Sequence, residues 1–589
     1  MAKKKILKTM FVAPVLCLTI GALTSCGKEA ADLVVYSDVF TAEEGNNGLA
    51  EAFAVKDGKY VYVGTKEGAK AYIKEGKTQV LDNKGLIIPG CTEGHAHYLD
   101  GVGLNSQLPG SGETYEKVLE LIEKKYKEEQ ITQFISFGWK TMSLHERKMT
   151  GHNFAEEIEA KAPGIPVVLI DDSGHSAVCN KTALERAGIT KENPTVRGGA
   201  VYFDKDGELS GYIGDQAVFY VSEKVISRPF SDAQYRSACE YGMNELLSQG
   251  YTNALDAFTN MYDPTGLYEA LQKMDNENKL KINISECFNM KSFDSIEYKA
   301  KIDEIVEIKN KYSSKHCDAS YIKLFLDGVV ESGTGWIFGE YKSPVDGKVH
   351  GNIIWDQPEV DALVSYANHN GLTIHAHTFG DAACKSALDA FINSNELNSN
   401  EYRNCLAHVR NIKTADIERA AKNNIPVAEN LLWHTDYNEK DPDSKATKDL
   451  IVANIGEDYY YSGYPMKSLV EKGVIVSSST DAPAAMDVPG NILNVIEVST
   501  TGMAPGDNGQ VFAANELLSV KEALKCLTIN GAYQLGIENE RGSIKVGKYA
   551  DFVVLDTNFL NYQGAELRNI HNTKIVNTYF EGEVAYKAN

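Results

Sequence analysis

The sequence predicts an α/β protein: a (β/α)8 barrel of the TIM type with an inserted cap, and a small β-sandwich domain formed by both chain ends. Short strands separated by Gly and Asp-Gly turns fill residues 32–88, and the same pattern returns over 543–589. Between them, apolar strands alternate with helical stretches over 89–542, which is typical of a parallel barrel. The segment of about 105–240 is too long for one strand–helix unit and is expected to contain the cap.

The N-terminal residues are predicted to be a targeting segment rather than part of this fold. Four lysines among the first eight residues precede an apolar stretch over 10–23 that is short for a membrane span. The run 23–26, Leu-Thr-Ser-Cys, resembles a bacterial lipoprotein cleavage site. The resemblance implies removal of residues 1–25, lipidation of Cys26, a tether over 26–31, and a membrane-anchored protein of the bacterial cell envelope. An ordinary secretory signal with an incidental cysteine is the alternative.

Composition excludes some partners. The formal net charge of −22, without a long basic stripe, argues against binding to nucleic acid, whose phosphates require a basic surface. Beyond Cys26, eight cysteines are scattered along the chain and no two form a C-x-x-C pair. Buried free thiols are therefore expected. Self-association into a homo-oligomer is left open.

The first chemically informative position follows the apolar strand 86–90. His95 and His97 stand two residues apart on an extended segment, so their side chains are expected to point the same way. Two convergent imidazoles are a natural half of a divalent metal site. The other half should come from the ends of later strands, since catalytic residues of such barrels gather there.

Later strands supply the expected partners. Lys323 stands within the apolar run 322–326, where burial would lower its pKa and let the neutral amine form a carbamate with carbon dioxide. An edge-strand lysine that faces water is the alternative. His375 and His377 follow the next strand, His408 follows 405–407, and Asp481 follows 474–478. Each signal alone is modest, but their order and position along the chain are hard to attribute to chance.

This order resembles the amidohydrolase superfamily of metal-dependent hydrolases, and in detail amidohydrolase family 3, which includes N-substituted formamide deformylases. The stretches that carry the resemblance are 88–97, 322–328, 377–381 and 479–483, with an insert motif over 172–176 and C-terminal stretches at 528–532 and 542–551. The sequence departs from the family at 91–94, after Asp327-Gly328, and at Ala407. These departures put the substrate in doubt more than the metal site.

The resemblance implies roles for six residues. His95, His97, Lys323 as a carbamate, His377 and His408 would hold one or two divalent ions, and Asp481 would contact the metal and act as the general base. Imidazole ligands suit zinc, with iron or manganese as alternatives. His375 competes with His377, which is preferred because the matching His-x-x-Gly-Asp stretch begins there.

Three further residues are expected on the substrate side. His175 lies on the expected cap, with a structural role as its alternative. Trp139 could line a pocket, although a single Trp is more often simply packed. His434 follows the strand 425–428.

The sequence therefore predicts a metal-dependent amidohydrolase. It would hydrolyse a C–N amide bond of a small molecule, other than a standard peptide bond, by means of a metal-activated hydroxide. A deaminase or cyclic-amide hydrolase on the same scaffold is one alternative. A surface lipoprotein that binds a solute without catalysis is the other, and a residue placed to move protons, Asp481, argues against it.

Overall fold

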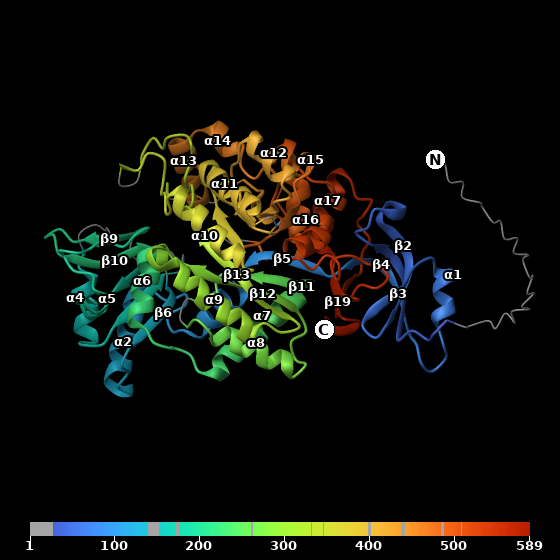
Figure 1. Ribbon diagram of the computed structural model, residues 1–589, viewed down its shortest axis with the longest axis horizontal. Helices are drawn as coiled ribbons and strands as arrows, with labels where there is room; N and C mark the ends of the chain where they lie inside the picture. Colours follow the sequence, from blue (N-terminus) through green and yellow to red (C-terminus); the bar gives the residue numbers. More distant parts are fainter. Residues whose placement is uncertain are drawn as a thin grey trace, which may run out of the picture.

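The computed structural model describes residues 28–139, 152–171, 174, 176–260, 263–331, 333–344, 347–398, 402–436, 442–483, 488–507 and 509–588. Figure 1 shows three parts along the long axis: the cap with α4 and β9 at one end, the barrel in the middle, and the sheet that contains β2 and β3 at the other end. Cys26 and His175, both singled out from the sequence, lie outside the described residues.

The central part is a nearly closed barrel of eight parallel strands, which confirms the predicted fold class. Its strands follow one another in chain order around the barrel: β5 (Cys91–Ala96), β11 (Tyr251–Asp256), β12 (Asn283–Met290), β13 (Cys317–Phe325), β14 (Thr373–Thr378), β15 (Cys405–His408), β16 (Val427–Glu429) and β17 (Val476–Ser478). The helices between successive strands include α7 (Asp232–Ser248), α8 (Gly266–Asn276), α9 (Tyr298–Tyr312), α10 (Gln357–His369), α11 (Asp381–Asn398), α12 (Thr414–Lys422) and α15 (Met466–Glu471), and α16 (Ile492–Thr501) follows β17.

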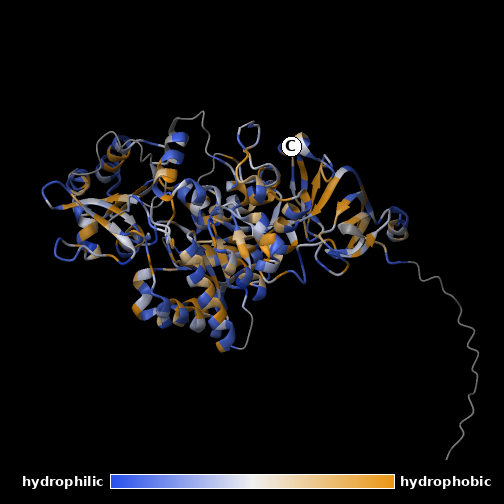
Figure 2. Cartoon of the chain, turned by 90° about the horizontal axis from the view of Figure 1, so that it is seen from above, coloured by the Kyte–Doolittle hydropathy of each residue, from blue (hydrophilic) through white to orange (hydrophobic). Residues whose placement is uncertain are grey.

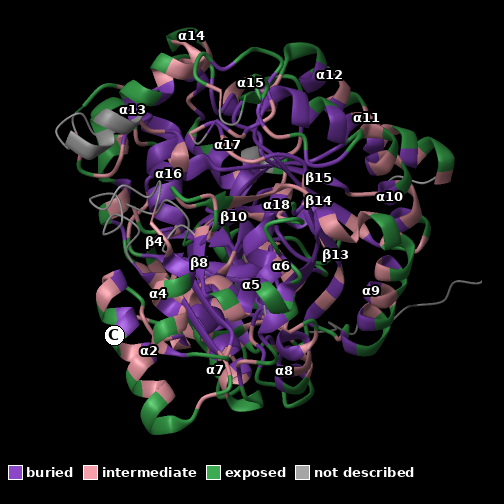
Figure 3. Cartoon of the chain, turned by 90° about the vertical axis from the view of Figure 1, so that its left-hand side faces the viewer, coloured by how far each residue is buried: buried purple, intermediate pink, exposed green. Residues whose placement is uncertain are grey.

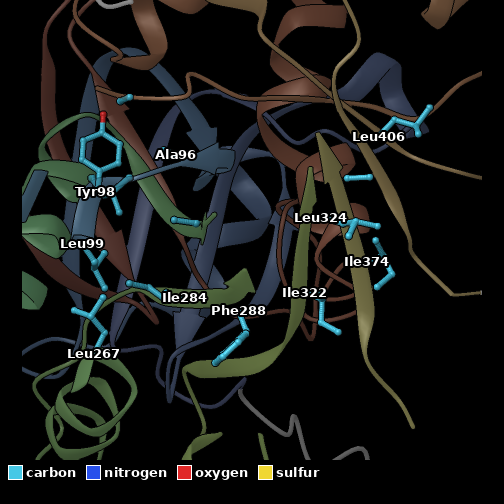
Figure 4. Close-up of a cluster of buried hydrophobic side chains, with 14 of the residues drawn as sticks. Ala96, Tyr98, Leu99, Leu267, Ile284, Phe288, Ile322, Leu324, Ile374 and Leu406 are labelled. Carbon is cyan, nitrogen blue, oxygen red and sulfur yellow. The ribbon is translucent and has the colours of Figure 1, made fainter. Parts of the chain in front are cut away.

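The barrel strands alternate apolar and functional residues. On β13, Ile322 and Leu324 belong to the large apolar cluster, while Lys323 lies between them. Because successive side chains of a strand point to opposite faces, Lys323 is directed to the interior of the barrel. Figure 4 shows the apolar side chains of β12 to β15, and Figure 3 shows that the buried residues concentrate in the strands while the outer helix faces are exposed.

The cap is inserted between β5 and β11. Its five-stranded sheet has the order β6 (Phe134–Trp139), β7 (Val167–Asp171), β8 (Ser176–Cys179), β10 (Leu209–Asp215) and β9 (Gly199–Phe203). The helices of this region are α2 (Tyr115–Glu129), α4 (Phe154–Lys161), α5 (Lys181–Ala187) and α6 (Gln216–Val225). The cap has an apolar cluster of its own, built on Tyr115, Trp139 and Phe154.

Both chain ends form one mixed sheet of seven strands, as the sequence predicts for the small β-domain. The order is β20 (Glu583–Lys587), β19 (Ile575–Phe580), β18 (Phe552–Leu555), β4 (Gln79–Pro89), β1 (Leu33–Phe40), β2 (Leu49–Lys56) and β3 (Lys59–Gly64). The N-terminal strand β4 pairs with the C-terminal strand β18, so that the two ends share one sheet. Figure 2 shows apolar residues gathered in these strands and hydrophilic residues on the outside.

Short hydrogen bonds join β5, the first strand, to the turn after β17, the eighth. The N–H of Asp481 donates to the carbonyl of His95 (2.8 Å), and the N–H of His97 donates to the carbonyl of Ala482 (2.8 Å). A carboxyl oxygen of Glu93 accepts from the N–H groups of His95 (3.1 Å) and Thr480 (2.9 Å). These contacts are called the seam below, and they close the barrel where the first histidine pair meets Asp481.

The eight cysteines beyond Cys26 are all buried and free, as expected from their scattered spacing. Burial raises the pKa of each thiol for which a shift is resolved, Cys526 to about 12 among them, so these groups stay protonated at neutral pH. Across the described ranges, no helix combines the length and the apolar character needed to cross a bilayer.

Position 94, between the seam residues Glu93 and His95, is closely packed and favours glycine. A Cβ at Gly94 would lie 2.7 Å from the Ser478 carbonyl oxygen and 2.7 Å from the Gln534 Oε1, whose side-chain amide donates to the Gly94 carbonyl. We expect Gly94→Ala to cost about 1–3 kcal/mol of stability through overpacking, seen as a lower melting temperature. Gly45→Ala is the matched control, because its Cβ would meet nothing within 4 Å. Equal melting temperatures for the two variants would contradict a closely packed seam.

Candidate metal centre

The histidine pair of β5 and the aspartate after β17 converge on one point. The Nε2 atoms of His95 and His97 each lie 3.3 Å from Oδ1 of Asp481. One ligand atom from each of the three residues lies within 4.8 Å of the others. The two imidazoles therefore point the same way, as their i, i+2 spacing predicts, and the seam brings to them a carboxylate that follows the last barrel strand, β17.

Lys323 joins this group from β13. Its side chain is 1% exposed and its Nζ lies 3.0 Å from Nε2 of His95. The alternative of an edge lysine that faces water is wrong, because β13 lies between β12 and β14 and the ammonium is enclosed in the barrel. Burial lowers the pKa of Lys323 to about 8, which makes the neutral amine accessible near physiological pH.

The histidines of the fifth and sixth strands lie beside the first-strand pair. The ring of His408 is 4.5 Å from that of His95 and 4.4 Å from that of His377. Each ring also has an outer contact: Nδ1 of His408 with the Asn430 carboxamide oxygen (2.9 Å), and Nε2 of His377 with the Gly328 carbonyl (3.1 Å). Contacts of this kind orient imidazoles that ligate metals and select their tautomer.

Aromatic rings line the side of the site formed by these two histidines. His377 packs against Phe325 (5.1 Å between centroids) and is stacked on Phe379 (6.0 Å). Trp433 is stacked on His408, with 6.1 Å between centroids and 15° between planes. Phe325 and Trp433 are half-buried. The ligand cluster is therefore bounded on this side by an apolar wall.

The electrostatics of the centre favour ligands in their metal-binding forms. Burial, with the nearby Lys323 and neighbouring imidazoles, holds the pKa of His95 and His408 well below the usual value, so both rings are neutral. Burial alone would raise the pKa of Asp481, but His408, His97 and Lys323 outweigh it and place it at about 2. Neutral imidazoles and an ionised carboxylate are the states that bind metals.

His97 shows where positive charge is stabilised. Burial opposes its protonation, but contacts with Asp100 and Asp481 outweigh this effect and raise its pKa to about 10. His97 is therefore protonated, and its positive charge lies beside Asp100 and Asp481. A bound cation could take the place of this proton. The donor set of imidazole nitrogen and carboxylate oxygen fits a divalent metal ion, zinc among the candidates.

Two residues of the centre are held in a strained backbone conformation. His408 has φ 75° and Asp481 has φ 56°, in the left-handed region that side chains with a Cβ rarely adopt. Such residues cost on the order of 1–3 kcal/mol each and persist only where the surroundings enforce them. Asp481 is enforced by the seam, since its own N–H is one of the donors across it.

The structure also places three acidic side chains behind His97 that the sequence reasoning missed. Asp100 lies 3.8 Å from Nδ1 of His97, and Asp256, at the end of β11, accepts from the N–H of Leu99 (2.7 Å). Glu286 pairs with Asp256 in the β11–β12 ladder, and both are fully buried with strongly raised pKa values, because burial penalises the charged forms. Asp256 stands at the end of a strand, as Asp481 follows the end of another, so the strand-end pattern in the sequence could have identified it. Asp100 does not directly follow a strand, so that pattern could not have identified it.

Two of the three residues expected on the substrate side, Trp139 and His434, lie in the described part of the chain, and there neither is in ring contact with a predicted ligand. Trp139 is fully buried in the core of the cap, with its ring 5.8 Å from Tyr115, which is the packed position expected as its alternative. His434 is fully buried with its ring 5.3 Å from Phe512, and burial lowers its pKa to about 4. Its neighbour Trp433, not His434, is stacked on a predicted ligand.

The comparisons with known proteins agree with this geometry. The amidohydrolase family model matches residues 79–586. The chain belongs to the amidohydrolase family. Membership and the His/Asp cluster assign it to the metal-dependent hydrolases of this superfamily, without assigning a substrate.

Two relatives match most of the chain and nearly their whole own length. An N-substituted formamide deformylase of Arthrobacter pascens is 24% identical over 94% of this chain and 98% of its own length. An exoenzymes regulatory protein, AepA, of Pectobacterium carotovorum is 24% identical over 80% and 97%. Among solved structures, an uncharacterized metal-dependent hydrolase of Pyrococcus horikoshii covers 90% of this chain and 98% of its own, with 18% identity and a TM-score of 0.66. The last likeness shows the fold.

Proposed function

We propose that the protein hydrolyses a C–N amide bond of a small molecule, other than a standard peptide bond, at the centre formed by His95, His97, Lys323, His377, His408 and Asp481. The observation that carries the proposal is the position of Asp481: an ionised, buried carboxylate 3.3 Å from the Nε2 atoms of two converging imidazoles. A site that only binds a solute has no need of a proton acceptor at that point.

In the proposed reaction, the ligands hold the metal ion and Asp481 transfers the proton. A divalent ion held there, zinc being the first candidate, supplies Lewis-acid polarisation of the amide carbonyl and lowers the pKa of water. His95, His97, His377 and His408 would hold the ion, and a carbamate on Lys323 would add an anionic oxygen ligand. The donor set accommodates one ion or two.

Asp481 moves the proton in this scheme. Its carboxylate takes the proton of the attacking water and then delivers it to the nitrogen that leaves, so that one residue serves both halves of the reaction. The apolar wall of Phe325 and Trp433 keeps bulk water from that side of the centre, and it suits an uncharged amide. The name of the Arthrobacter relative, an N-substituted formamide deformylase, supports formyl and other simple acyl amides as the first compounds to test.

The N-terminal segment supports a second part of the proposal, namely that Cys26 carries a lipid that anchors the exported enzyme to a membrane of the cell envelope. The support is the run Leu-Thr-Ser-Cys after a basic and an apolar stretch. Described residues begin at Lys28, close to the start of the terminal sheet, so a short tether would separate the anchor from the fold.

Replacement of the general base gives the first prediction here. In the zinc-loaded protein, Asp481→Asn should lower kcat by about 10²- to 10⁴-fold on whichever amide the wild type cleaves, because the proton acceptor is lost. The panel contains N-formyl amines, N-acyl amino acids and cyclic imides, with amino-purines added to detect ammonia from a deaminase. Asp449→Asn, at an exposed position of α13 (Pro442–Ile455), is the control. Bound metal with no turnover that depends on Asp481 would favour a binding protein instead.

The carbamate gives the second prediction. Lys323→Ala should lose bound metal, because the anionic oxygen ligand that the carbamate would supply is removed from a buried position. Short carboxylic acids such as acetate should restore part of the metal content and activity by occupying the space left by the carbamate. Metal content is measured by mass spectrometry of the dialysed protein. A metal content equal to that of the wild type would remove Lys323 from the ligand set.

The anchor gives the third prediction. Cys26→Ser should move the protein from the membrane fraction to the soluble fraction, because a hydroxyl cannot take the thioether-linked lipid. Cys17→Ser, within the segment expected to be removed, should leave membrane association unchanged. Fractionation followed by immunoblotting reads out both variants. Membrane association that survives Cys26→Ser would contradict lipidation.

A further inference from the structure

We infer that His375, which is not in the proposed ligand set, is a positioning residue that fixes the ring and the tautomer of His95. The inference rests on the metal centre of the proposed function and adds an outer hydrogen bond to it. Nε2 of His375 lies 2.6 Å from Nδ1 of His95, and the two ring centroids are 4.8 Å apart. This is a direct contact between two imidazoles from opposite parts of the barrel, β14 and β5.

The register of the barrel places His375 one layer below His377. In the parallel ladders, His375 pairs with Lys323 on β13 and with Cys405 on β15, whereas His377 pairs with Phe325 and Ala407. Both histidines face inward because they are two residues apart. His377 is the one whose ring lies 4.4 Å from His408, and His375 is the one that reaches His95.

The two nitrogens of His95 face different partners. Nε2 of His95 lies 3.0 Å from the Lys323 Nζ and 3.3 Å from the Asp481 Oδ1, so this atom points to the place where the predicted ligands converge. A nitrogen that binds a metal carries no proton, so the His95 proton must sit on Nδ1. Nδ1–H then donates to Nε2 of His375, whose own proton must be on Nδ1.

The environment of His375 supports this assignment. The residue is 1% exposed, and its Nδ1 has no hydrogen-bond partner among the described residues. Leaving a buried N–H unpaired costs about 1–3 kcal/mol, whereas an apolar residue would avoid that cost. The polar contact that the imidazole does make, with His95, gives it a role that an apolar side chain could not fill.

The test compares glutamine and asparagine at position 375, because their side-chain oxygens lie at different distances from the backbone. The side-chain oxygen of His375→Gln can lie near the place of Nε2, whereas that of His375→Asn reaches only the place of Nδ1. We expect His375→Asn and His375→Ala to weaken zinc binding about 10- to 100-fold, as for other outer-shell partners, and His375→Gln to stay near the wild-type affinity. Zinc affinity is measured by competition with a chromogenic chelator, without substrate.

Cys405→Ala is the matched control, because Cys405 is the buried ladder neighbour of His375. Among the described residues, its thiol hydrogen-bonds to the Leu406 carbonyl and to no predicted ligand. It should bind zinc like the wild type. Melting temperatures of the metal-free variants separate loss of folding from loss of the contact. His375→Gln and His375→Asn are expected to have similar melting temperatures.

Three results would overturn the inference. His375→Gln could bind zinc as weakly as His375→Ala, or His375→Ala could bind it as tightly as the wild type. X-ray absorption of zinc-loaded His375→Gln could also show one imidazole fewer than the wild type, which would make His375 a ligand. Tight zinc binding without hydrolysis would count against the proposed function alone. A wild type that binds no zinc would count against both.

Discussion

The rest of the structure depends on the seam between the first and the eighth strands of the barrel. Asp481 and His97 donate backbone hydrogen bonds across it, and Glu93 accepts from both sides. Burial raises the pKa of Glu93 to about 8, although its two backbone donors oppose this. The same few contacts therefore close the barrel and bring a carboxylate from after β17 to the histidines of β5, residues almost four hundred positions apart in the chain.

The seam also explains how the centre tolerates its strain. Asp481 and His408 adopt left-handed backbone conformations that are unfavourable alone. The seam fixes the Asp481 backbone through its N–H, and the His408 ring is held by Asn430, just after β16. Hydrogen bonds from neighbouring groups fix the imidazole rings in the same way. Asn430 holds His408, Gly328 holds His377, and His375 holds His95. A rigid set of ligands is what a metal-dependent hydrolase needs, because a bound ion then meets groups that require little rearrangement.

The sequence predicted those features that depend on local spacing. Inward-facing residues two apart on a strand, and residues at the ends of parallel strands, must meet inside a barrel; His95, His97 and Lys323 follow from that rule. Spacing could not separate His375 from His377, because both face inward and only the register with β13 and β15 distinguishes their layers. The surroundings of Trp139 could not be predicted from the sequence. Its neighbours in the cap come from Tyr115, α4 and β7, and no local sequence pattern connects these segments to it.

If the seam assembles a metal centre from His95, His97 and Asp481, a bound ion must lie among these three residues. Anomalous diffraction at the zinc edge, from crystals of the zinc-loaded protein, locates that ion. We expect a peak within about 2.0–2.2 Å of Nε2 of His95, Nε2 of His97 and a carboxylate oxygen of Asp481. A strongest peak away from these three residues, or none inside the barrel, would contradict this expectation.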